Sequence, residues 1–126
     1  MNIKLILAIV GFNLLTSCSD NPKPNFDFKN WASDTKGCKG IRSKLSHQFS
    51  EIQSFLTKKS EKEVIKYLGR PDAIELNKRH IKTYIYQLEP SLSCDSNYNL
   101  DTNSTLVYCI EFNSLGLSSI ISEQLR

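Results

Sequence analysis

The hydrophobic residues of this chain follow three different spacings from one end to the other. Residues 5–15 form an almost uninterrupted apolar run, and residues 41–68 repeat apolar side chains every three or four positions. Residues 73–121 contain short stretches in which apolar and polar side chains alternate. The second spacing is that of one face of an α-helix, and the third is that of a half-buried β-strand. We therefore expect helices first and strands afterwards.

Two helices are expected in the middle of the chain. The first begins after Lys39, and its apolar face would consist of Ile41, Leu45, Phe49, Ile52 and Phe55 or Leu56. The second has clearer ends, because Ser60 and Glu63 match the capping box, Gly69 fits a left-handed C-cap and Pro71 prevents continuation. Such a short helix is stable only when it is docked on the rest of the fold.

Three or four antiparallel strands are expected after the helices. They are predicted at residues 73–76, 81–88, 105–112 and 117–121. Residues 113–116 form a tight turn that ends in glycine, which adopts positive φ without strain. Two N-terminal helices followed by a three- or four-stranded meander predict an α+β two-layer sandwich with the helices on one face of the sheet.

The first apolar run has the layout of a secretory signal peptide, because it follows a short basic start and is shorter than the roughly 20 residues that cross a bilayer. It ends in Leu15-Thr16-Ser17-Cys18, which resembles the lipobox of bacterial lipoproteins. That resemblance implies cleavage before Cys18, a diacylglyceryl group on its thiol and a further acyl chain such as palmitate. Two or three acyl chains anchor a protein stably where one is marginal. The alternative is an ordinary signal peptide followed by a chance cysteine.

These features divide the chain into three parts. Residues 1–17 are expected to be the lipoprotein signal peptide, residues 18–30 the lipidated cysteine with a flexible, proline-containing tether, and residues 31–126 one folded domain. In the Gram-negative sorting pattern that this start resembles, an aspartate directly after the cysteine favours retention in the inner membrane. Ser19 occupies that position here, and the first acidic residue is Asp20. We therefore expect an outer-membrane lipid anchor.

Three further cysteines predict a disulfide, because export places them in an oxidising compartment. Cys38 precedes the first helical pattern and Cys94 lies in the long polar loop 89–104, so both are at element ends where a bridge could join loop to helix. We favour a Cys38–Cys94 bridge with Cys109 free, and a Cys94–Cys109 bridge is the alternative. Cys109 is expected on the side of its strand opposite its apolar neighbours Ile110 and Phe112.

Composition and motifs do not indicate a catalytic, metal-binding or nucleic-acid-binding protein. The formal net charge is only +3, without a basic stripe. Lys58, Lys59, Lys62 and Lys66 are interleaved with two glutamates, which favours a solvated helix face over a phosphate or lipid-headgroup site. His47 and His80 are isolated and no C-x-x-C is present, so no metal or cofactor is expected. Neither histidine has a recognisable partner motif for catalysis, and we expect no enzyme activity.

Residues 56–121 resemble the small outer-membrane lipoprotein domain of the SmpA/OmlA family, the BamE-like domain. The resemblance rests on the polar helix start at 60–64, on Leu-Gly-Arg-Pro at 68–71, on the aromatic pair of the strand at 84–86, and on Ile-Glu-Phe-Asn-Ser-Leu-Gly-Leu at 110–117. The first helix and the loop that contains Cys94 are longer than in the family pattern. Trp31, Cys38 and Cys94 have no counterpart in it.

The resemblance implies a small non-catalytic envelope protein that binds another envelope protein, in outer-membrane assembly or integrity. Partner binding would use a few aromatic anchors. The candidates are Phe26, Trp31, Tyr84, Tyr86 and Tyr108. Packing is the favoured alternative, at the edge of the domain for Phe26, Phe28 and Trp31 and between strands for the tyrosines. The alternative function is a periplasmic inhibitor-like or ligand-binding module, because secreted β-lactamase-inhibitor-like proteins have a similar order of helix and sheet.

Overall fold

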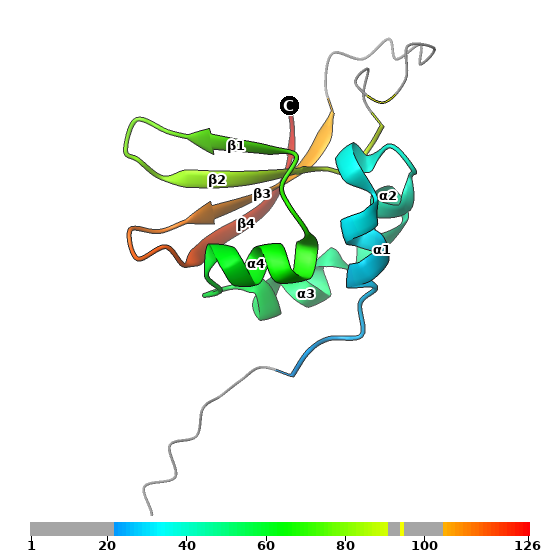
Figure 1. The fold of residues 1–126 in the computed structure, drawn as a ribbon, viewed down its shortest axis with the longest axis horizontal. Helices are drawn as coiled ribbons and strands as arrows, with labels where there is room; N and C mark the ends of the chain where they lie inside the picture. Colours follow the sequence, from blue (N-terminus) through cyan, green and yellow to red (C-terminus); the bar gives the residue numbers. More distant parts are fainter. Residues whose placement is uncertain (1–21, 91–93, 95–104) are drawn as a thin grey trace, which may run out of the picture.

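Helices cover one face of a four-stranded antiparallel sheet (Figure 1). The structure is a computed structural model and describes residues 22–90, 94 and 105–126. The strands lie in the order β1-β2-β3-β4, so each pairs with its neighbour in the sequence. They are β1 (Ala73–Leu76), β2 (Lys82–Gln87), β3 (Leu106–Phe112) and β4 (Ser118–Leu125). The predicted α+β meander is confirmed, with four strands.

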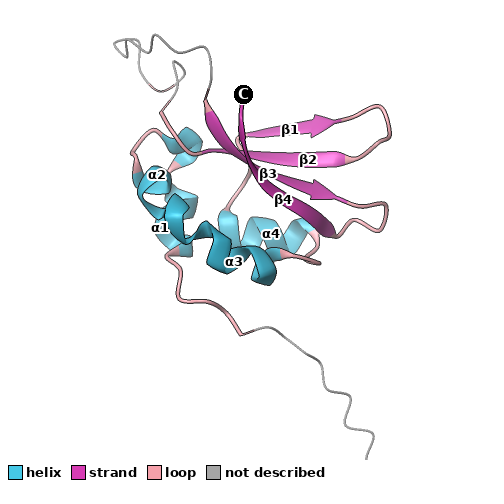
Figure 2. Ribbon diagram, turned by 180° about the vertical axis from the view of Figure 1, so that it is seen from behind, coloured by secondary structure: helices cyan, strands magenta, loops and turns pink. Residues whose placement is uncertain are grey.

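The helical layer contains more segments than the two helices predicted. It consists of α1 (Phe28–Ser33), η1 (Thr35–Gly37), α2 (Ile41–Leu45), η2 (Ser46–Gln48), α3 (Phe49–Leu56) and α4 (Glu61–Leu68). The prediction of one helix from Lys39 to Leu56 is wrong, because the run tightens to a 3₁₀ turn at η2. There the Ser46 hydroxyl donates to the Ser43 carbonyl at 2.8 Å, a bond of the kind that competes with regular helix geometry. Seen from behind, the helices still lie on one side of the sheet (Figure 2).

Both ends of α4 use the residues that the sequence indicated. The Ser60 hydroxyl accepts from the Glu63 amide at 3.3 Å, and the Glu63 carboxylate accepts from the Ser60 amide at 2.8 Å, which confirms the capping box. Gly69 ends the helix at φ 76° and ψ −178°, so its φ is positive as predicted but its backbone is not left-handed helical. This region is essentially restricted to glycine. A Cβ at Gly69 would lie 3.1 Å from the Cβ of Ala32, so α4 ends tightly against α1.

The main core lies between the helices and the sheet. Its most deeply buried apolar side chains are Trp31, Phe49, Ile52, Leu56, Val64, Leu68, Tyr86, Leu88, Ile110 and Phe112. Phe26 and Phe28 are also buried, with ring centroids 4.9 Å apart. The folded unit therefore begins at Phe26, and the expected boundary at residue 31 falls too late. The expectation that these aromatics pack at the edge of the domain is confirmed.

A buried ion pair connects the helical layer to the sheet. Asp72 accepts a hydrogen bond from Arg42 Nη1 at 2.6 Å, from the Gln87 amide at 2.7 Å and from the Lys36 amide at 2.9 Å. The side chains of Arg42 and Asp72 are 1% and 2% exposed. The Arg42 guanidinium also donates to the Trp31 carbonyl at 3.2 Å. Because these buried charges have close partners, we regard the network as structural.

The predicted disulfide between Cys38 and Cys94 is present, with 5.4 Å between the two Cα atoms. It joins the segment between η1 and α2 to a position distant in the sequence. Cys109 is free, and the alternative Cys94–Cys109 bridge is therefore wrong. As predicted, Cys109 faces away from Ile110 and Phe112. It forms a small buried cluster with Ile85 and Val107 on the sheet face opposite the main core.

Candidate protein-interaction surface

The aromatic residues considered as partner anchors are all in the core. Trp31, Tyr84, Tyr86 and Tyr108 are at most 6% exposed, and Phe26 is also buried. Trp31 packs on Phe49 with 5.2 Å between ring centroids. Since a buried ring contacts no partner in this conformation, the anchor interpretation is wrong for all five residues. The favoured packing alternative is confirmed.

The three tyrosine hydroxyls also have partners inside the protein. That of Tyr84 donates to Glu61 Oε1 at 2.8 Å, that of Tyr86 to the Gly69 carbonyl at 2.9 Å and that of Tyr108 to the Ser46 carbonyl at 3.1 Å. Burial raises the pKa of all three, and the hydrogen bond to Glu61 contributes for Tyr84, whose pKa is about 12. These hydroxyls therefore stay protonated at neutral pH and tie the sheet to the helices.

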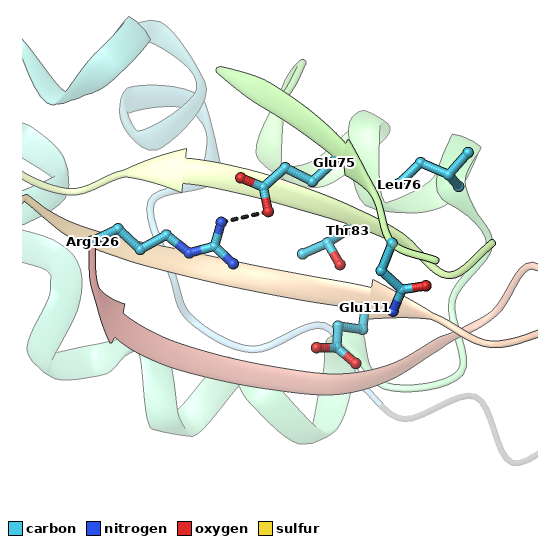
Figure 3. A pocket seen from close by; sticks show the side chains of 6 residues that line it. Glu75, Leu76, Thr83, Glu111 and Arg126 are labelled. Atoms are coloured by element: carbon cyan, nitrogen blue, oxygen red, sulfur yellow. Dashed lines mark hydrogen bonds and ion pairs between the residues drawn. The ribbon is translucent and has the colours of Figure 1, made fainter. Parts of the chain in front are cut away.

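The sheet face without helices contains a hollow of about 320 Å³, which we call the open-face hollow (Figure 3). It is lined by Glu75, Leu76, Asn77, Thr83, Glu111 and Arg126. Arg126 follows β4 at one edge of the sheet, yet its Nη1 lies 2.5 Å from Oε2 of Glu75 in β1, at the other edge. The sheet is therefore strongly coiled, because twist accumulates from strand to strand and brings the two edges together.

The open-face hollow is lined mostly by charged and polar side chains. The hydrogen bond to Glu75 raises the pKa of Arg126, which stays charged. Cys109 belongs to the buried cluster on this face, and burial raises the pKa of its thiol, which favours the unreactive protonated form. Within 22–90, 94 and 105–126, no three His, Cys, Asp or Glu side chains are grouped so that they could hold a metal ion. The hollow offers carboxylates, a guanidinium and a hydroxyl as hydrogen-bonding groups.

The two edges of the sheet differ in their surroundings. Along β4, the Lys58 amide donates to the Ser118 carbonyl at 2.8 Å and the Ser118 amide donates to the Lys59 carbonyl at 2.8 Å. Further along, Gln53 Nε2 of α3 donates to the Ile121 carbonyl at 3.0 Å. The first half of β4 is thus bonded to α3 and to the loop that follows it.

β1 has no such cover. It pairs with β2 alone, and outside that pairing none of the described residues hydrogen-bonds to the backbone of Ala73–Leu76. The Asn77 amide donates to the Ile81 carbonyl of the β2 side at 3.0 Å. Because amides alternate in direction along an antiparallel strand, those of Leu76 and Ile74 point outward. We call this outward side the β1 edge, and an unpaired edge is a template for another strand.

Two large apolar side chains are exposed on β1. Ile74 is 58% exposed and Leu76 is 63% exposed. They lie two positions apart, so both project to the same side of the strand. Glu75 projects to the other side, and Figure 3 shows its side chain directed to Arg126 while that of Leu76 points away from the hollow. The β1 edge thus combines unpaired backbone groups with an apolar row.

Unpaired positive charges lie at both ends of β1. Arg70 precedes the strand, and Lys78 and Arg79 are in the turn after it. All three are exposed, and none forms an ion pair within the part of the chain that the structure describes. The acidic residue of the strand, Glu75, is already paired with Arg126. The surroundings of the β1 edge are therefore positive.

The other residues singled out by sequence contribute little to this surface. Cys18 lies outside the described residues, and Cys38 and Cys94 form the disulfide. His47 is exposed on the helical side, and His80 is exposed in the turn after β1. Sequence reasoning missed Ile74 and Leu76 as surface residues. Their alternation predicted a strand, but whether that strand is covered depends on tertiary structure.

Comparisons of the chain with protein-family models, with curated proteins and with solved structures gave no significant match. In the described part of the chain, each helix is too short or too polar to span a bilayer.

Proposed function

We propose that this protein is a lipid-anchored lipoprotein of the bacterial outer membrane and acts there as a small, non-catalytic module that binds another envelope protein. In this proposal the signal peptide is removed, Cys18 holds the lipid and the residues before Phe26 form the tether. The domain would belong to the SmpA/OmlA type and function in outer-membrane assembly or integrity. The lipobox Leu15-Thr16-Ser17-Cys18 and the motifs at 60–72 and 110–117 support this assignment.

The observation that carries the binding function is the uncovered β1 edge with its exposed Ile74 and Leu76. Exposed apolar side chains beside unpaired strand backbone are a liability for a free protein and a common feature of interaction sites. The first half of the opposite edge is hydrogen-bonded to Gln53 of α3 and to the loop at Lys58 and Lys59, so along that stretch β4 lacks the free strand backbone that β1 has.

Co-purification of the processed full chain from detergent-solubilised envelopes tests this function. We expect a stoichiometric complex with a membrane or periplasmic envelope protein. Recovery of the chain without a stoichiometric partner would contradict the proposal. Capture of a secreted enzyme whose activity falls on binding would instead favour the inhibitor-like alternative.

A further inference from the structure

We infer that the β1 edge binds an extended, acidic segment of a protein partner, which adds to the sheet as a fifth strand. The inference rests on the proposed protein-binding function and specifies its surface and the chemistry of its ligand. Strand addition of this kind gains affinity from main-chain hydrogen bonds and specificity from alternate side chains.

The hydrogen bonding of the backbone favours β1 over the first half of β4. The outward amides of Ile74 and Leu76 have no hydrogen-bond acceptor among the described residues, whereas Ser118 and Ile121 of β4 are already bonded to the helical side. A partner strand on β1 can form its hydrogen bonds without displacing any residue that the structure describes. On the first half of β4 it would have to displace Gln53 and the loop at Lys58 and Lys59.

The side chains define what the added strand presents. Ile74 and Leu76 lie on one side of β1, 58% and 63% exposed, so apolar side chains at alternate positions of the partner can pack on them. On the other side of the strand, Glu75 is held by Arg126, and it is not free to pair with a basic partner. A strand with alternating apolar residues therefore matches this edge.

Charge complementarity favours acidic residues at the ends of that strand. Arg70 lies before β1, and Lys78 and Arg79 lie after it, all exposed and without an ion-pair partner among the residues described. An acidic segment would gain attraction at both ends, and a basic one would be repelled. This excludes a second copy of β1 as a well-matched partner, because two copies would place their cations together.

A short synthetic peptide of alternating valine and threonine, flanked at both ends by aspartate and glutamate, provides the probe. Its binding to the processed full chain in detergent would be measured by fluorescence anisotropy, beside a peptide with the same centre and lysine at the ends. We expect the acidic peptide to bind at least about tenfold more tightly and to weaken as salt is added. Equal binding of the two peptides, or no binding of the acidic one, would overturn the inference.

Two pairs of variants locate the binding. Ile74→Pro removes an outward amide without breaking a bond to β2 and should abolish binding. Leu76→Asp should weaken it about tenfold or more, whereas Leu125→Asp, at a leucine of similar exposure on β4, should not. Unchanged far-ultraviolet circular dichroism would show that each variant is folded. Binding that survives Ile74→Pro, or that Leu125→Asp reduces as strongly as Leu76→Asp, would place the peptide elsewhere and overturn the inference.

Amide hydrogen exchange provides a direct structural readout. Bound acidic peptide should slow the exchange of the Ile74 and Leu76 amides, which point outward in the free protein. Slowing at Ser122–Leu125 instead, or dimerisation of the chain through β1 without peptide, would overturn the inference. The proposed function is tested separately, by co-purification. If a stoichiometric envelope partner is found and its binding survives Ile74→Pro, the proposed function would stand and the β1 edge would be excluded as its binding site.

Discussion

Asp72 illustrates how one side chain joins the two layers of this protein. Its carboxylate accepts hydrogen bonds from Arg42, from the amide of Gln87 in β2 and from the amide of Lys36 in the helical layer. Sequence reasoning used Pro71 to mark the end of a helix but assigned no structural role to Asp72. A single acidic residue after a proline carries no sign that its partner lies thirty positions earlier in the chain.

We predict that Asp72→Ala lowers the free energy of unfolding by about 3 to 5 kcal/mol, because it leaves the Arg42 charge buried without its counterion. Urea denaturation would measure the loss. Lys82→Ala serves as the control, since it breaks an ion pair with Glu61 whose side chains are 43% and 34% exposed. That pair should contribute less than about 1 kcal/mol. Equal losses in the two variants would contradict the structural role of the buried pair.

A second prediction concerns the tyrosine hydroxyls under the helices. Burial and the hydrogen bond to Glu61 raise the pKa of Tyr84 to about 12, above the value of about 10 for an exposed tyrosine. The stabilisation that this difference represents is complete below about pH 10, and it is lost as the pH rises toward 12. Urea denaturation from pH 9 to 12 should show this decline, and Tyr84→Phe should reduce it. An identical decline in the variant would contradict the assignment.

At the scale of the elements, the sequence predicted most of the features that depend on residues close together in the chain. The capping box, the positions of all four strands and the end of α4 at Gly69 follow from residue types at fixed spacings. The short α1 was missed because its six residues show no complete apolar period, and its Asp27 cap has no capping-box partner. The 3₁₀ turn at η2 was missed because the apolar spacing continues across it.

The disulfide also concerns the elements, because it joins Cys38, just before α2, to Cys94, which lies 56 positions later in the sequence. Cys38→Ser and Cys94→Ser should each lower stability by about 2 to 4 kcal/mol under non-reducing conditions, because the bridge restricts the unfolded chain. Thermal melts with and without reductant would measure this loss. With reductant, both variants should melt like the wild type.

Cys109→Ser is the matched control for these variants. This substitution alters a free buried thiol. The difference in melting temperature between Cys109→Ser and the wild type should therefore be the same with and without reductant. Melts of Cys38→Ser and wild type that coincide under non-reducing conditions would show that the bridge does not form in solution.

For the whole molecule, the proposed interaction surface could not be predicted from sequence. Tyr84, Tyr86 and Tyr108 attracted attention as aromatic residues, but a β-strand has two faces and the pattern does not tell which face the helices cover. Ile74 and Leu76 have the same alternation as buried strand residues, and they are exposed because β1 is the last strand on its side of the sheet. Whether a strand lies at an exposed edge depends on the order of the strands in the sheet, which the alternation of residues does not give.

The proposed attachment to a membrane also concerns the whole molecule. We predict that Cys18→Ala moves the protein from the membrane fraction to the soluble or unprocessed fraction, because the alanine has no thiol to accept lipid. Fractionation and mass spectrometry of the mature N-terminus would measure this. Ser17→Ala, which keeps a small residue before the cysteine, should remain membrane-bound. Membrane attachment of Cys18→Ala equal to that of wild type would contradict lipidation at this residue.

The unequal edges of the sheet also limit how far this protein could polymerise. Suppose that two molecules joined through β1 at high concentration, against the repulsion of their cations. Each would then present β4 on the outside, where Ser118 and Ile121 are already bonded to the molecule's own helical side. Growth into a fibril requires an open strand at both ends of every unit. Further growth along the first half of β4 would therefore have to displace Gln53 and the loop at Lys58 and Lys59.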